Sequence, residues 1–227
     1  MDQSPSLGRC AVVEGIGTAL LLAAIVGSGI MAERLAGGNA AMALLANAIA
    51  TGAALVALIE AFGPVSGAHF NPLVTIADAS QGGIAWRAVP FYLLAQVLGA
   101  LVGVGAANLM FDLPLYTVSE HIRHGPGQLL SEGIATFGLV AVIWGCSLRR
   151  PSQTPLAVGA YIMAGYWFTA STALANPAVT IARSLTNTFS GIRPVDVPGF
   201  IVVEVIGAAV ATVLFRWISP RSATGRS

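Results

Sequence analysis

The sequence predicts an all-α membrane protein with six spanning helices and two shorter helices that enter the membrane without crossing it. Hydrophobic residues make up 56% of the 227-residue chain and charged residues only 9%, whereas a soluble domain carries about 25% charged residues. One phrase also occurs twice, as residues 71–77 (NPLVTIA) and 176–182 (NPAVTIA). Most of the surface is therefore expected to face lipid, with the two phrases inside the helix bundle.

Each copy of the phrase begins as a helix commonly begins. Asn71 and Asn176 can cap free backbone N–H groups, and Pro72 and Pro177 lose no hydrogen bond at the first helical position. The apolar run that follows each Pro is far shorter than the ~20 residues that a spanning helix needs. We therefore expect two short re-entrant helices.

Apolar segments long enough to span the membrane are expected at six places around these phrases. They cover roughly residues 10–31, 40–62, 88–110, 129–148, 156–170 and 199–218. A Gly-Pro-rich turn at 63–67 is expected to lead into the first phrase. The first apolar stretch is longer than the core of a cleaved signal peptide, so we expect it to remain as a membrane helix.

The internal repeat extends beyond the twin phrase. Glu14 opens the string EGIGTA, and Glu132 opens the similar string EGIATF. Gln96 opens QVLGA, which Glu204 matches with EVIGA. The sequence thus predicts equivalent positions for Glu14 and Glu132, and for Gln96 and Glu204.

The whole chain, residues 1–227, is expected to form one domain of two repeats, at about 9–111 and 128–219. Each repeat holds three spans and one half-helix, so the second copy must run inverted in the membrane. Inverted repeats place their discontinuous helices, and hence the working site, near the membrane midplane.

The distribution of arginine favours a multi-pass protein with both termini in the cytoplasm, because cytoplasmic loops are richer in basic residues. In that orientation the inner side holds more arginines than the outer side. The inner set is Arg9, Arg87, Arg149, Arg150, Arg216, Arg221 and Arg226, and the outer set is Arg34, Arg123, Arg183 and Arg193.

In an inverted repeat the two half-helices enter from opposite faces and meet at their N-termini. Asn71 and Asn176 would then lie side by side, each capping its helix with the side-chain oxygen and offering its NH2 group to the lumen. Both positive dipole ends would oppose cations. The preceding turns, 67–70 and 173–175, would expose backbone carbonyls as hydrogen-bond acceptors. This arrangement predicts a pore for neutral solutes.

The chain resembles the aquaporin, or major intrinsic protein, family. Residues 66–72 (SGAHFNP) are close to the first signature of that family, and residues 176–178 (NPA) match the second. The resemblance covers all six spans. It implies a pore in each protomer, a homotetramer, and a location in the lipid of the cell membrane.

Two departures from the family pattern concern the pore. Leu73 replaces the usual Ala of the first signature, where Ala178 keeps it in the second, and the bulkier residue is expected to repack the junction or shift Asn71. Val179 stands where most relatives have an Arg that forms one wall of the outer constriction. Arg183, one turn later, is either a partial replacement or, as we prefer, a surface residue at the helix end.

The resemblance implies three further residues of the selectivity filter besides Val179. Thr51 takes the second-span position and Ala173 the loop position. On the fifth span, helix register gives Tyr166, whereas loop length gives Ala164, and we prefer the helix register. Such a filter would be wider and less polar than one that selects water.

Ionisable groups inside membrane spans are costly and commonly functional. For Glu14 and Glu132 a proton relay is one reading, but we favour carboxylates that accept hydrogen bonds from the re-entrant turns. His69 is expected to pin the first turn by a hydrogen bond. Glu204 would be protonated or would lie at a subunit interface.

These features together predict a passive channel for small uncharged solutes such as glycerol, urea and neutral metalloid hydroxides, with some water. A mainly water-selective channel, an ion-coupled transporter and a membrane-packing protein with a closed pore remain as alternatives. We expect no enzyme, because no nucleophile, base or metal-ligand cluster is visible, and hence no cofactor or metal. The net charge of +1 argues against nucleic acid as a partner.

Overall fold

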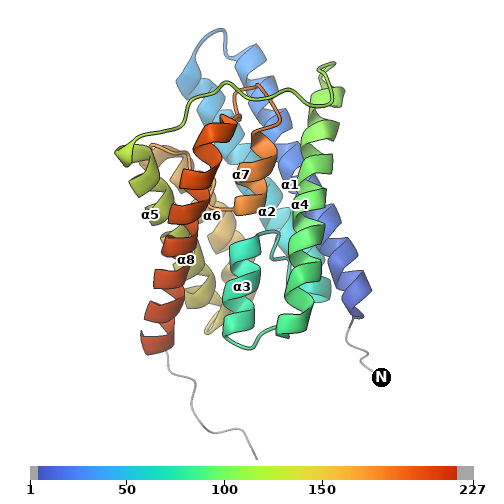
Figure 1. The fold of residues 1–227 in the computed structure, drawn as a ribbon, viewed down its shortest axis with the longest axis vertical. Coiled ribbons are helices and arrows are strands. Elements are labelled where there is room, and N and C mark those ends of the chain that lie inside the picture. Colours follow the sequence, from blue (N-terminus) through green and yellow to red (C-terminus); the bar gives the residue numbers. More distant parts are fainter. Residues whose placement is uncertain (1–4, 219–227) are drawn as a thin grey trace, which may run out of the picture.

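The computed structural model describes residues 5–218, and the helices within that range surround a pair of short central helices (Figure 1). Arg221, Arg226 and the last residue of the second repeat lie outside the described residues. The helices are α1 (Leu7–Leu35), α2 (Ala40–Ser66), α3 (Pro72–Ser80), α4 (Val89–Met110), α5 (Pro126–Ser147), α6 (Thr154–Phe168), α7 (Pro177–Arg183) and α8 (Val197–Ile218). Single 3-10 turns at Trp86–Ala88, Pro151–Gln153 and Pro194–Asp196 precede α4, α6 and α8.

The two repeats pack in the same way. Helix α1 packs against α4 and α2, and α5 packs against α8 and α6. Contact between α2 and α6 joins the halves, while α3 and α7 lie one above the other in the centre, each touching α4 or α8 (Figure 1). Helix α1 begins and α8 ends at the same end of the molecule. We call this the inner end and the opposite end the outer end.

Glycines allow the closest helix approaches in both repeats. A Cβ atom at Gly99 would overlap the carbonyl oxygen of Gly15, which brings α4 against α1. A Cβ atom at Gly207 would likewise overlap the carbonyl oxygen of Gly133, between α8 and α5. Small residues at such crossings let backbones approach closely, which is how helices associate in a membrane.

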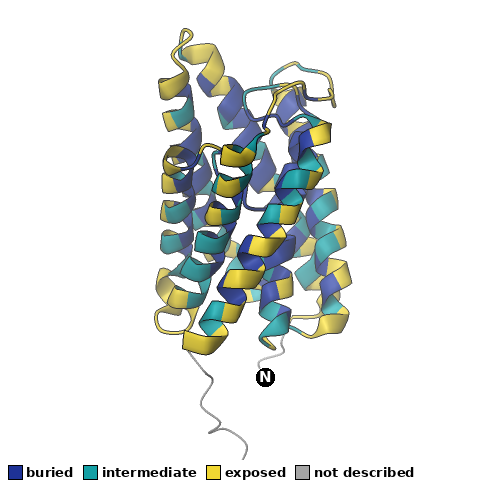
Figure 2. Ribbon diagram, turned by 60° about the vertical axis from the view of Figure 1, so that its left-hand side comes forward, coloured by how far each residue is buried: buried dark blue, intermediate teal, exposed yellow. Residues whose placement is uncertain are grey.

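The outward faces of the helices are apolar and exposed, as a lipid-facing surface requires. Figure 2 shows exposed stripes along the outside of the bundle and buried faces turned inward. On α4, Leu94, Leu98 and Val102 recur at four-residue intervals and are 60%, 53% and 62% exposed. The fold is therefore the all-α transmembrane architecture that the sequence predicts.

The fifth span is as short as the sequence analysis expected, but it occupies residues 154–168 rather than 156–170. Five helical segments of residues 5–218 are long and apolar enough to cross a membrane, but α6 has only 15 residues. It ends because Thr169 adopts an extended conformation, and its hydroxyl donates to the carbonyl of Gly165 at 2.6 Å. The chain then leaves the helix early and enters the second re-entrant loop.

The predicted turn at 63–67 was wrong, because α2 continues through Pro64 to Ser66. A Pro inside a helix removes one backbone donor, and a membrane helix tolerates this where neighbouring groups satisfy the freed carbonyl. The helix ends at Gly67, which has a left-handed φ of 89° and donates its N–H to Gly63. Glycine adopts this conformation at low cost.

Candidate functional site

A cavity of about 470 Å³ runs along the bundle interior beside both half-helices. Its inner end is lined by Asp78, Ile84 and Trp144, and its outer end by Tyr166 and Arg183. Both repeats contribute to the wall, through α1, α2, α5, α6, both re-entrant loops and both half-helices. The cavity therefore follows the path that a solute crossing the bundle would take.

The two asparagines lie together in the middle of this cavity wall. The Oδ1 atom of Asn71 accepts from the N–H of Leu73 at 2.9 Å, and Oδ1 of Asn176 accepts from Ala178 at 3.0 Å. Each Nδ2 group donates across the junction, from Asn71 to the Ala175 carbonyl and from Asn176 to the Phe70 carbonyl, both at 2.8 Å.

One of the two N–H bonds on each asparagine amide is thus used to join the half-helices. The second N–H bond has no partner among residues 5–218, and both Asn71 and Asn176 line the cavity. The sequence analysis assigned the whole NH2 group to the lumen, whereas the structure leaves one donor per asparagine for a solute.

The two re-entrant loops repeat the same unusual backbone. Ala68 and Phe70 have φ values of 49° and 48°, and Ala173 and Ala175 have 50° and 49°. These positions lie three residues and one residue before each Asn. A left-handed conformation costs a residue with a Cβ about 1–2 kcal/mol, so other contacts must hold both loops in place.

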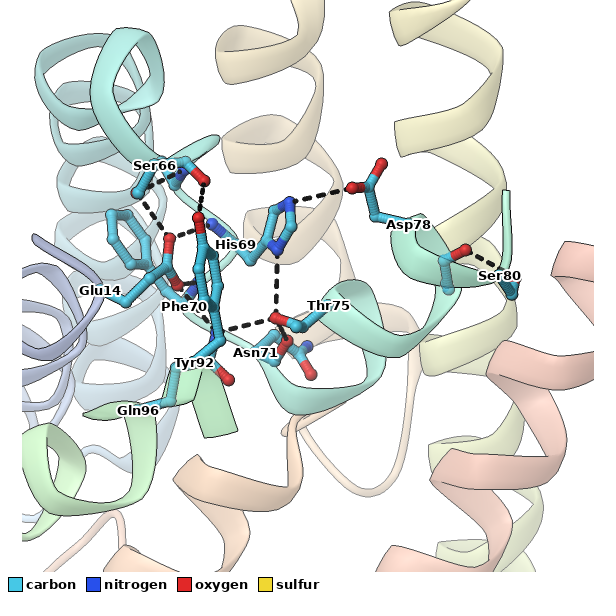
Figure 3. Close-up of polar contacts among 12 residues, drawn as sticks. Glu14, Ser66, His69, Phe70, Asn71, Thr75, Asp78, Ser80, Tyr92 and Gln96 are labelled. Carbon is cyan, nitrogen blue, oxygen red and sulfur yellow. Dashed lines mark hydrogen bonds and ion pairs between the residues drawn. The ribbon is translucent and has the colours of Figure 1, made fainter. Parts of the chain in front are cut away.

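Glu14 holds the first loop from the interior of α1. Figure 3 shows its carboxylate among the loop donors. The Oε1 atom accepts from the hydroxyl of Ser66 at 2.6 Å and the N–H of His69 at 2.9 Å. The Oε2 atom accepts from the N–H of Phe70 at 2.7 Å and the Gln96 amide at 2.8 Å. These bonds satisfy loop donors that would otherwise be buried without partners.

His69 fixes the same loop to the half-helix that follows it. Its Nδ1 atom lies 3.1 Å from the hydroxyl oxygen of Thr75, and its Nε2 atom lies 3.8 Å from Oδ2 of Asp78 (Figure 3). Gln96 donates to the same Thr75 hydroxyl at 2.9 Å. His69 and Asp78 also line the inner part of the cavity.

The second loop is held by two carboxyl groups. Glu132 accepts from the N–H groups of Leu174, at 3.3 Å, and Ala175. Glu204 accepts from the N–H of Asn176 at 3.2 Å and from the hydroxyl of Thr180 at 2.6 Å. Glu204 is fully buried within one chain, so the expectation that it might lie at a subunit interface was wrong.

All four residues predicted for the filter line the same cavity. Thr51, Tyr166, Ala173 and Val179 are at most 3% exposed. The hydroxyl oxygens of Thr51 and Tyr166 lie 3.2 Å apart. Ala164, the alternative to Tyr166, belongs to the exposed face of α6, whereas Tyr166 lies in the cavity wall.

Leu73 points away from the pore. It does not line the cavity but packs with Val140 of α5 and with Ala208 and Ala211 of α8. The small alanines of α8 leave room for the larger side chain, and the cap from Asn71 to Leu73 is intact. This departure from the family signature therefore changes helix packing rather than the cavity.

Arg183 is not the surface residue that we preferred from the sequence. It is 2% exposed, lies in the last turn of α7 and lines the outer end of the cavity. Its Nε atom donates to the carbonyl of Ser190. A second buried arginine, Arg123, reaches the same region from the loop between α4 and α5. Sequence reasoning missed Arg123, because a single Arg in a polar loop carries no signal of burial.

Comparison with known proteins decides the family. A model of the major intrinsic proteins matches residues 1–173. The chain belongs to the major intrinsic protein family. It is 54% identical over 216 residues to the aquaglyceroporin AqpS of Rhizobium meliloti (strain 1021), which covers 95% of this chain and 92% of that protein.

Two proteins with lower identity are also similar to most of this chain. The probable aquaporin NIP7-1 of Arabidopsis thaliana is 31% identical over 220 residues, covering 93% of this chain and 77% of that protein. The solved structure of the aquaglyceroporin from Plasmodium falciparum superposes with a TM-score of 0.71 at 20% identity, covering 96% of this chain and 98% of that one. The major intrinsic protein fold is thus present over nearly the full chain.

Proposed function

We propose that this major intrinsic protein is a passive channel for small uncharged solutes: glycerol, urea, neutral metalloid hydroxides and some water. The carrying observation is the cavity itself, which passes both asparagines and the uncharged residues Thr51, Tyr166, Ala173 and Val179. The relative at 54% identity is named an aquaglyceroporin, which supports the same class of solute.

The cavity wall has the hydrogen-bonding groups that a hydroxylated solute needs. The carbonyls of Gly67, Ala68 and His69, and those of Ala173 and Leu174, accept no hydrogen bond from residues 5–218, and all five residues line the cavity. Solute hydroxyl groups can donate to these carbonyls and accept from the free N–H groups of the asparagines. Such contacts replace the water that a solute loses on entry.

The uncharged filter favours solutes larger than water. Val179 and Ala173 offer an apolar surface, while Thr51 and Tyr166 offer two hydroxyl groups. A molecule such as glycerol has a carbon backbone for the apolar surface and hydroxyl groups for the polar one. A guanidinium at position 179 would instead narrow the passage and hold water by charged hydrogen bonds.

Ions are excluded by fixed positive charge along the path. The N-termini of α3 and α7 meet at the asparagines, and each helix dipole places about half a positive charge there. Arg183 adds a full charge one turn outward of the filter. In this way Arg183 partly replaces the missing filter arginine electrostatically without occupying the constriction.

A coupled carrier fits the cavity less well than a channel does. Among residues 5–218, Asp78 is the only acidic residue that lines the cavity, and it lies at the inner end rather than beside the asparagines. An ion-coupled transporter would be expected to bind its ion near the midplane.

We also propose that the protein is a homotetramer in the cell membrane, with the inner end and both termini in the cytoplasm.

A panel of solutes tests the proposed function. Proteoliposomes containing the protein are mixed in a stopped-flow instrument with gradients of glycerol, urea, boric acid or an impermeant sugar. We expect faster glycerol and urea entry than in protein-free vesicles, together with moderate water flow. Fast water flow with glycerol and urea rates equal to those of empty vesicles would instead identify a water channel, and no acceleration of any kind would identify a closed pore.

A further inference from the structure

Two buried arginines lie near the outer end of the cavity, and Arg183 is the one that lines it. Arg183 is 2% exposed and Arg123 is 6% exposed. Their Nε atoms donate to adjacent carbonyls of one loop, Arg183 to Ser190 and Arg123 to Gly191. The two guanidinium groups are therefore fixed beside the same short segment, although they come from elements 60 residues apart.

Neither guanidinium forms an ion pair with a carboxylate of residues 5–218. The ion pairs among residues 5–218 are His69 with Asp78 and Arg193 with Asp196, so no carboxylate lies within 4.0 Å of either buried arginine. Arg123 uses its remaining bonds on the Ser171 carbonyl at 3.0 Å and the Thr172 hydroxyl at 3.2 Å. These partners are dipoles, and they satisfy donors without cancelling the charge.

Burial, and then the nearby charge of Arg183, lower the pKa of Arg123, which lies in the loop outside the spans, to about 9. A buried charge without a counter-ion is strongly unfavourable, and a buried pair of like charges is more so. An anion bound beside Arg183 would offset this positive charge.

Arg183 also has donors free to make this contact. Only its Nε atom is bonded to residues of 5–218, and its two Nη groups, at the cavity wall, have no protein partner there. Arg183 is thus nearly completely buried, yet its free donors face a cavity. This arrangement is typical of a binding site rather than of a solvated side chain. The planar fork of an arginine matches paired oxygens on one ligand.

We propose that Arg183 binds a small monovalent oxyanion, such as a carboxylate, in the outer vestibule of the pore, and that the nearby charge of Arg123 strengthens the attraction. The ligand must be small because Arg183 lies in the cavity itself, only one turn outward of Val179. A bound anion at this place also obstructs the entrance to the filter, so occupancy should slow the passage of neutral solutes.

The test uses methanesulfonate, an oxyanion whose acid is strong, so that it never becomes neutral and cannot follow the solute path as an acid. Sodium chloride at equal ionic strength is the reference, because a chloride ion has no paired oxygens to match the fork of an arginine. The first readout is the thermal unfolding temperature of the purified protein in detergent, which does not depend on channel activity. Binding to the folded state raises this temperature in a concentration-dependent way.

Wild type should unfold at a higher temperature in methanesulfonate than in chloride. The matched control Arg193→Gln, a half-exposed arginine of the same region paired with Asp196, should show the same rise. Arg183→Gln should show none, and Arg183→Lys should keep a smaller one. No rise in wild type, or an equal rise in Arg183→Gln, would overturn the proposal.

Glycerol flux into proteoliposomes gives a second, independent readout. At a methanesulfonate concentration equal to the dissociation constant, half of the sites are occupied, and wild-type flux should fall about twofold relative to chloride. This comparison uses only the wild-type protein, so it tests the proposed binding site even if Arg183→Gln fails to fold. Unchanged flux with a clear rise in unfolding temperature would retain the site but refute its place at the pore entrance.

Discussion

Replacing Val179 by Arg tests whether this position sets the size of the solute that passes. Val179 is 3% exposed, lines the cavity and follows the Asn176 cap on the first turn of α7. The variant places a guanidinium beside Tyr166 and Ala173, in the part of the wall that is now uncharged. The change therefore adds both bulk and charge at the filter and nowhere else.

The expected size of the effect follows from steric and electrostatic discrimination. A pocket that must accommodate extra methylene-sized groups discriminates by about 1–3 kcal/mol, or roughly 10- to 200-fold. Glycerol should lose that much flux, whereas water, which fits beside a guanidinium and hydrogen-bonds to it, should lose less than about threefold. The new charge lies one turn from Arg183, so like-charge repulsion should lower helix stability by a few tenths of a kcal/mol.

The assay compares glycerol and water permeability in the same batch of proteoliposomes. Val179→Leu is the control, because it adds bulk without charge and should reduce glycerol flux by a smaller factor. Protein amounts and tetramer content are checked in each preparation. An equal loss of glycerol and water permeability in Val179→Arg, or no change in either, would refute the assignment of Val179 to the filter.

Three further substitutions, with Gly8→Ala as a control, test the contacts and charges around the pore. Glu14→Ala leaves the buried N–H groups of His69 and Phe70 without an acceptor, and thermal unfolding should show a loss of roughly 2–6 kcal/mol; a loss below about 1 kcal/mol would contradict the role of this carboxylate. Gly99→Leu places a side chain against the backbone of α1 and should cost at least about 1–3 kcal/mol, whereas Gly8→Ala, which meets no atom within 4 Å, should cost little. Arg183→Gln should raise the proton leak of proteoliposomes measured with a trapped pH dye, and an unchanged leak would show that the helix dipoles exclude protons alone.

Much of the fold could be predicted because its signals are repeated. The Asn-Pro phrases, the glutamates at positions 14 and 132 and the long apolar segments each occur in both halves, so one half checks the other. The lengths of helix ends were less predictable. Pro64 and Gly63 are typical turn residues, yet α2 continues through them, since contacts around the re-entrant loop outweigh local preference.

The residues of the site that escaped prediction act through tertiary contacts. Nothing in the local sequence marks Ala68 or Ala173 as left-handed, because the carboxylates that hold these loops come from distant helices. Arg123 is buried by carbonyls of residues 171 and 191, which are far away in the sequence. The spacing of apolar residues indicates which face of a helix is buried. It does not indicate which loop folds back into the cavity.

The most direct test of the proposed channel is glycerol flux measured against glycerol concentration, with and without sodium and proton gradients. A passive pore predicts a rate that rises in proportion to the glycerol gradient and is unchanged by either ion gradient. Saturation at low glycerol concentration, or flux that requires an ion gradient, would contradict a channel and indicate a coupled carrier.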